Sequence, residues 1–188
     1  MTFIQKLAIG IILIASTLTI HETEAQGRGR RVFHPVVVRK AHVRYAAMPR
    51  WGTVVAVRPA TAVAIRGTRR NRYYFHNGIY YSPRRGSYVV VRPSPGLRIR
   101  SLPAGYRTVV VGPRNYYYYY GTFYTKASDV DQYDVVEAPE GAIVDALPDG
   151  YEIKTVGNNE YYFLDGIYYA EVDAPEFADG VGYEVVRI

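Results

Sequence analysis

A nine-residue, tyrosine-rich segment occurs three times in this chain and limits what the chain can fold into. It reads Tyr-Tyr-Phe-His-Asn-Gly-Ile-Tyr-Tyr at residues 73–81, Tyr-Tyr-Tyr-Tyr-Tyr-Gly-Thr-Phe-Tyr at 116–124 and Tyr-Tyr-Phe-Leu-Asp-Gly-Ile-Tyr-Tyr at 161–169. Asn-Gly and Asp-Gly between β-favouring runs are typical of a two-residue type I′ turn, because that turn needs positive φ at both central residues. Tyr120-Gly121 is a weaker form of the same signal. The sequence therefore predicts three β-hairpins.

Two-residue turns also fix which residues lie opposite each other. Counting outward from each turn, the expected pairs are His76:Ile79, Phe75:Tyr80 and Tyr74:Tyr81, then Tyr119:Thr122, Tyr118:Phe123 and Tyr117:Tyr124, then Leu164:Ile167, Phe163:Tyr168 and Tyr162:Tyr169. Successive pairs point to opposite faces, so each hairpin has one Phe:Tyr face and one Tyr:Tyr face. Because Phe has no polar tip, we expect the Phe:Tyr face inward and the Tyr:Tyr face nearer solvent. The alternative is that neighbouring strands pack against both faces.

The hairpins belong to a longer repeat of about 45 residues. Residues 88–91 and 133–136 read Tyr-x-Val-Val, residues 96–106 and 141–151 end in Leu-Pro-x-Gly-Tyr, and a short β-favouring run then precedes each following hairpin. Pro and Gly lie at the joints, and no window has helical periodicity. We therefore predict an all-β fold of tandem small β-modules, barrel- or sandwich-like, of about 45 residues each, with about five strands in a unit. Two such modules packed together are favoured over an edge-to-edge array.

The first 25 residues have the pattern of a secretory signal peptide. Lys6 precedes an apolar run at residues 7–14, and Thr23-Glu24-Ala25 offers a small-residue cleavage site. No later segment is long and apolar enough to span a bilayer, so none is expected after cleavage. The chain contains no cysteine, which excludes disulfides and thiolate ligands. We expect an exported protein of the bacterial envelope, periplasmic or extracellular.

Charge divides the rest of the chain into two parts. Residues 26–128 hold 20 basic and no acidic residues, whereas residues 129–188 hold 15 acidic and 2 basic residues. We therefore predict a basic flexible arm at 26–47, a basic β-module at 48–128 and an acidic β-module at 129–188. The asymmetry suggests an external anionic partner or attraction between oppositely charged parts, within one molecule or by self-association. The excess of Arg over Lys favours carboxylate or phosphate recognition.

The sequence gives little support to catalysis. His34, His42 and His76 have no spacing that suggests a metal site, and no nucleophile elbow, phosphate loop or dinucleotide fingerprint occurs. We expect no cofactor, no metal and no enzymatic activity. The alternative is an envelope enzyme with an unrecognised carboxylate or His site.

Binding through aromatic and basic side chains is the better hypothesis for function. Exposed tyrosine pairs stack on sugar rings or peptides, and nearby arginines add affinity for polyanions. Export makes nucleic acid an unexpected partner, so we expect a glycan or an anionic envelope polymer. The candidate binding residues are Tyr74, Tyr81, Tyr117, Tyr124, Tyr162, Tyr169, Arg84, Arg85, Arg98 and Arg100.

The combination of Tyr-Tyr-x-x-x-Gly-x-Tyr-Tyr, Tyr-x-Val-Val and Leu-Pro-x-Gly-Tyr resembles a family of exported bacterial proteins of unknown function. The resemblance covers residues 72–188, and the Leu-Pro-x-Gly-Tyr motif makes it fairly specific. The chain departs from the pattern at Tyr120-Gly121 and in its Arg-rich N-terminal third. The resemblance implies export and a β-repeat, and it implies no activity.

Overall fold

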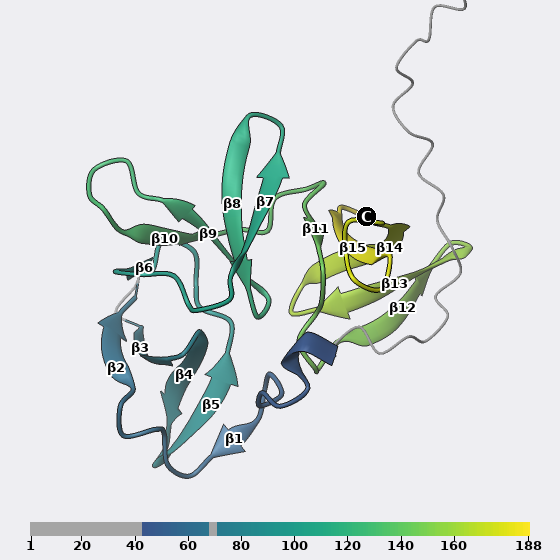
Figure 1. Ribbon diagram of the computed structural model, residues 1–188. Coiled ribbons are helices and arrows are strands. Elements are labelled where there is room, and N and C mark those ends of the chain that lie inside the picture. The colour runs from purple at the N-terminus through teal and green to yellow at the C-terminus, as the bar shows by residue number, and fades with distance from the viewer. Residues whose placement is uncertain (1–42, 68–70) are drawn as a thin grey trace, which may run out of the picture. The chain divides into compact units, whose positions relative to one another are not determined.

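The computed structural model describes residues 43–67 and 71–188, which form strands, turns and one short 3₁₀ helix, η1 (Val43–Tyr45). Three separate five-stranded antiparallel sheets follow one another along this part of the chain (Figure 1). The predicted all-β class and the repeat of small β-modules are therefore confirmed.

Each sheet is built from one continuous stretch of chain. The first sheet contains β1 (Val54–Val55), β2 (Val63–Arg66), β3 (Arg72–His76), β4 (Ile79–Arg84) and β5 (Ser87–Val91). The second sheet contains β6 (Arg98–Ile99), β7 (Arg107–Val111), β8 (Arg114–Tyr119), β9 (Thr122–Lys126) and β10 (Tyr133–Val136). The third sheet contains β11 (Ile143–Val144), β12 (Glu152–Val156), β13 (Asn159–Leu164), β14 (Ile167–Asp173) and β15 (Val181–Val186).

The three sheets share one strand order, in which the first strand pairs with the last and the other strands form a meander. The orders are β1-β5-β4-β3-β2, β6-β10-β9-β8-β7 and β11-β15-β14-β13-β12. Each sheet has two unpaired edges, so the barrel-like form of our prediction is wrong. The first sheet is also a complete copy of the repeat, although its sequence lacks the Leu-Pro-x-Gly-Tyr motif. Met48-Pro49 and Trp51-Gly52 stand in that place, which is why the sequence indicated only two full units.

The sheets do not follow the charge boundary at residue 128. Strand β10 comes from the acidic stretch, yet it pairs with β6 and β9 of the basic stretch. A division into a basic module at 48–128 and an acidic module at 129–188 would therefore cut the second sheet. Backbone pairing, not net charge, decides where one sheet ends, because β10 continues the hairpin order that all three sheets share.

The predicted arm at 26–47 falls mostly outside the described residues. Its described end is part of the packed structure, since Tyr45 in η1 is buried. The Tyr45 hydroxyl accepts a hydrogen bond from the backbone N–H of Tyr120 at 3.1 Å. The packed part of the described structure therefore includes Tyr45, which precedes the predicted start of the basic β-module at Met48.

The predicted register of all three hairpins is confirmed. Every pair expected from the turn geometry forms in β3–β4, β8–β9 and β13–β14. Tyr120, the least favourable turn residue, has φ of +46° and is followed by Gly121 at +74°, as a type I′ turn requires. A bulky residue in this conformation is uncommon, so surrounding contacts must hold it there.

Two of the three hairpin turns are covered by an aromatic ring and by the proline of the following repeat. A Cβ atom at Gly78 would collide with the Tyr119 ring and approach Pro103, and one at Gly121 would collide with Trp51 and approach Pro148. A Cβ atom at Gly166, the equivalent position in the third hairpin, would meet nothing within 4 Å. Turns of one type thus have different surroundings: residues of the following repeat lie against Gly78 and Gly121, and Trp51, which precedes the first sheet, also lies against Gly121.

Candidate anion-binding site

Most tyrosines of the predicted binding faces are interior residues. Tyr124, Tyr162 and Tyr169 are each 0% exposed, and Tyr81 is also buried. The expectation that the Tyr:Tyr faces lie nearer solvent is therefore wrong at these four positions. In the third hairpin the order is even reversed, since Phe163 is only partly buried.

Buried hydroxyl groups explain how tyrosine can occupy these positions. The Tyr124 hydroxyl lies 3.1 Å from that of Tyr80, and Tyr162 donates to Glu171 Oε2 at 3.0 Å. Burial raises the pKa of Tyr124, and the hydrogen bond with Tyr80 opposes part of that rise. A phenol with a partner can be buried at little cost, whereas an unpartnered one is expensive.

The two remaining predicted tyrosines are half-buried and contact other rings. Tyr74 meets Tyr88 edge to face at 5.5 Å between ring centroids. Tyr117 meets Tyr106 and Tyr133 in the same way, at 5.4 and 5.5 Å. These rings mainly build the sheets and offer little free face for stacking a ligand.

Arg98, one of the predicted binding residues, is held by acidic residues of its own sheet. Its Nε and Nη2 donate to the two carboxylate oxygens of Asp134 at 2.6 and 2.9 Å, and Nη1 donates to Asp129 at 2.9 Å. The hydrogen bond from Arg98 is the main cause that lowers the pKa of Asp129. This arginine is already neutralised within the molecule.

Other arginines outside the first sheet are neutralised in the same manner. Arg44 and Arg107 share the carboxylate of Asp145, with Nη1 and Nε at 2.7 and 2.9 Å from its oxygens. Arg92, just after β5, donates to Asp165 at 2.9 Å. Acidic residues after position 128 therefore compensate part of the basic stretch internally, as one of our two readings of the charge pattern predicted.

Arg84 and Arg85 lie where the structure leaves positive charge unbalanced. They end β4 and open a two-residue turn to β5, in which Arg85 has φ of +37° and Gly86 of +80°. Both arginines are exposed and form no ion pair with any described residue. Arg100 is exposed and unpaired as well, but it lies after β6.

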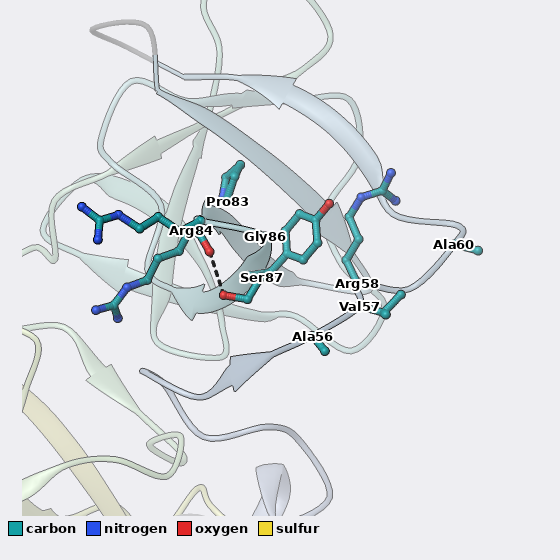
Figure 2. Close-up of a pocket in the computed structure, with 10 residues that line it drawn as sticks. Ala56, Val57, Arg58, Ala60, Pro83, Arg84, Gly86 and Ser87 are labelled. Carbon is teal, nitrogen blue, oxygen red and sulfur yellow. Dashed lines mark hydrogen bonds between the residues drawn. The ribbon is translucent and has the colours of Figure 1, made fainter.

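An open pocket of about 620 Å³ lies beside this turn (Figure 2). Its walls come from the β1–β2 connection and from the β4–β5 hairpin, and no carboxylate or histidine lines it. The lining residues are Ala56, Val57, Arg58, Ala60, Pro83, Arg84, Arg85, Gly86, Ser87 and Tyr88. The structure therefore places Arg84 and Arg85 around the same pocket as Arg58, a residue that sequence reasoning missed. Arg98 and Arg100 do not line this pocket.

Arg58 is the most constrained cation of the pocket. Its guanidinium carbon lies 4.2 Å from the centroid of the Tyr74 ring and 5.9 Å from that of Tyr88. Its Nη1 donates to the carbonyl oxygens of Pro59 and Ala62 at 3.2 and 3.4 Å. Its Nε is buried and has no hydrogen-bond partner in the described structure. The ring and the two carbonyls orient the guanidinium but leave its buried Nε without an acceptor among the described residues.

Two further observations concern other kinds of site. Within residues 43–67 and 71–188, no group of three or more His, Asp or Glu side chains is arranged to hold a metal ion. In the same residues, no helix has the length and apolar character that crossing a bilayer requires.

Comparison with known proteins finds a match to a protein-family model only. A family model described as a family of unknown function (DUF6515) matches residues 19–188. No curated protein and no solved structure matches the chain. The match covers all three sheets.

Proposed function

We propose that this chain, which belongs to that family of unknown function, is an exported, non-enzymatic protein of the bacterial envelope. Its role is to bind an anionic polymer or glycan through the arginines of the first sheet. The N-terminal pattern of Lys6 followed by the apolar run at residues 7–14 supports export. Those residues lie outside the described structure, so the sequence alone carries this part of the proposal.

The observation that carries the binding role is the uneven compensation of charge. Residues 54–91 contain no Asp or Glu, and the described arginines of this stretch form no ion pair with described residues. These arginines are Arg58, Arg66, Arg72, Arg84 and Arg85. In the second sheet, by contrast, Arg98 and Arg107 are bound by carboxylates of the same chain. The first sheet therefore keeps the positive potential that attracts a polyanion.

The placement of these charges favours a polymer over a small ion. Figure 2 shows Arg58 and Arg84 on different sides of the pocket, with their guanidinium groups directed apart. A single small anion would reach one of them, whereas a chain with repeated negative groups can contact both. The enzyme alternative would need a buried His or carboxylate cluster in a pocket, and the lining of this pocket contains neither.

The test is binding of the full chain to polygalacturonate, with neutral pullulan of matched length as the control polymer. We expect binding to polygalacturonate only, with affinity that falls steeply as salt rises, because bound counterions are released. The variant Asp134→Asn should bind somewhat more tightly, since it removes one of the two carboxylates that neutralise Arg98. Equal binding to both polymers, or affinity that is indifferent to salt, would contradict the proposal.

Self-association is a second candidate, favoured by exposed carboxylates in the acidic part of the chain. Glu137, Glu160 and Glu176 are exposed and form no ion pair with described residues. A second copy could place this acidic surface against the arginines of the first sheet, which gives a head-to-tail contact. Sedimentation velocity at low and high salt tests it: assemblies that dissociate with salt support the contact, and a monomer at low salt excludes it.

A further inference from the structure

The pocket beside the β4–β5 turn suggests which chemical group of the polymer is recognised. This inference rests on the proposed function and specifies its site. A guanidinium group has two edges that can each hold a carboxylate through two parallel hydrogen bonds. The edge of Arg58 that has no hydrogen-bond partner among the described residues therefore indicates where a carboxylate can bind.

Arg98 shows how this protein uses such an edge. Its Nε and Nη2 hold the two oxygens of Asp134, which is a side-on bidentate contact. In Arg58 the same edge is the vacant one, since only Nη1 donates to backbone carbonyls. Neither Nε nor Nη2 of Arg58 has a hydrogen-bond partner in the described structure.

The cost of the vacant edge makes a bound anion favourable. A buried donor without an acceptor destabilises a structure, because the donor has lost its hydrogen bonds to water. A carboxylate against Nε would remove that cost and add a charge-assisted hydrogen bond. The contact with Tyr74 and the two carbonyl acceptors already restrict the guanidinium, so little side-chain entropy remains to be lost on binding.

The rest of the pocket fits an acidic sugar. Val57 is 80% exposed, and Ala56, Ala60 and Pro83 add further apolar surface. The C–H face of a sugar ring can rest on such side chains while its carboxylate faces a guanidinium. Arg84 and Arg85 lie on the hairpin side of the same pocket, where they can meet the next negative group along a polymer.

We propose that the pocket binds one acidic sugar unit of a carboxylate-bearing polysaccharide. The Nε–Nη2 edge of Arg58 receives the carboxylate side-on, and Arg84 with Arg85 binds a neighbouring anionic group. Binding at Nε requires a small movement of Arg58 or of the side chains that cover it, because this atom is buried in the free protein.

Arginine Nε–H nuclear magnetic resonance observes the proposed contact directly in the unaltered full chain. Adding a short oligogalacturonate should shift the Arg58 Nε–H signal, assigned by its loss in Arg58→Lys. A neutral galactan of the same length should leave the signal in place. If oligogalacturonate binds and moves other arginine signals but not that of Arg58, the proposal is wrong while the polymer-binding function stands.

Affinity for polygalacturonate supplies the second measurement. Arg58→Lys keeps the charge but loses the fork, and we expect about tenfold weaker binding. Arg114→Lys is the matched control, because Arg114 is an exposed arginine at the start of β8, outside the pocket. It should change affinity less than about twofold. Equal effects of the two substitutions, in chains with wild-type melting temperatures, would overturn the role of the fork.

The hairpin arginines and the anion class are tested in the same assay. The double variant Arg84→Gln, Arg85→Asn should lower the slope of log affinity against log salt by about 2, one for each lost charge. Asn is chosen at position 85 because it tolerates the positive φ there. Dextran sulfate and polyphosphate should bind more weakly than polygalacturonate of equal charge. Tighter binding of either would assign the pocket to that anion and contradict the carboxylate assignment.

Discussion

The second and third sheets have the same strand order and the same hairpin register, yet their hairpins lie in different surroundings. The turn of β8–β9 is covered by Trp51 and Pro148, whereas the turn of β13–β14 is open at Gly166. A similar difference exists at the third residue pair from the turn. Tyr124 shares a hydrogen bond with Tyr80, while the equivalent Tyr169 is fully buried and its hydroxyl has no partner among the described residues.

This difference shows that a repeated motif specifies local geometry but does not determine how much each of its residues contributes to stability. Type I′ turns form in both hairpins because the turn residues adopt positive φ. What each residue contributes to stability then depends on which distant side chains reach it. Equivalent substitutions in the two sheets should therefore have unequal effects.

High pH should produce the largest effect, because it acts on both sheets together. Burial raises the pKa of Tyr124 and Tyr169 above the ordinary value of about 10. Above pH 10 the unfolded chain releases protons that the folded chain keeps, so the free energy of unfolding falls as pH rises and is unaffected below that range. We expect cooperative unfolding in alkali, seen as tyrosinate absorbance that rises together with the loss of far-ultraviolet circular dichroism.

A chain unfolded in urea serves as the control for that titration, since its tyrosines should ionise near their ordinary pKa. Ionisation of all tyrosines in a chain that keeps its circular dichroism would show that these side chains are not enclosed as the structure has them.

Substituting the turn glycines should give the clearest difference between the two sheets. Gly166→Ala places a side chain at φ of +85° in open space, so the cost is backbone strain of about 1 kcal/mol. Gly121→Ala adds a collision with Trp51 and should cost about 3 kcal/mol or more. Urea unfolding of both variants measures the two costs. Equal shifts of the midpoint would mean that the cover over Gly121 is absent in solution.

Removing the hydroxyl groups of Tyr124 and Tyr169 one at a time should change the stability of the chain by smaller and unequal amounts. Tyr124→Phe leaves the Tyr80 hydroxyl without its partner and should destabilise the chain by about 1 kcal/mol. Tyr169→Phe removes a buried hydroxyl that no residue of 43–67 or 71–188 hydrogen-bonds, so stability should stay constant or rise by up to about 1 kcal/mol. Thermal unfolding of the two variants decides the matter, and a clear loss for Tyr169→Phe would reveal an unseen partner for its hydroxyl.

Sequence reasoning predicted those parts of the fold that depend on neighbouring residues. Asn77-Gly78 and Asp165-Gly166 determine their turns locally, and the turns determine the register of three hairpins. The Tyr:Tyr faces could not be oriented in this way. Their orientation depends on partners such as Glu171 and Tyr80, which the fold brings to the hydroxyl groups.

The candidate site was predictable only in part. Arg84 and Arg85 were singled out, but no sequence pattern connects them with Arg58, which lies in the β1–β2 connection. One overlooked signal was Arg85-Gly86 between two β-favouring runs, which forms a further two-residue turn and creates one wall of the pocket. The pairing of Arg98 with Asp134 could also have been predicted, because the two residues lie opposite each other in β6 and β10 of the same repeat.

The cover of the first two hairpin turns by residues of the next repeat has a consequence for the order of folding. A chain emerging N-terminus first can form the β3–β4 hairpin early, but Gly78 gains its neighbours only after Pro103 and Tyr119 have emerged. Gly121 can meet Trp51 as soon as it emerges, but it gains Pro148 only later. Packing around these two turns should therefore be completed only after residues of the next repeat have been synthesised.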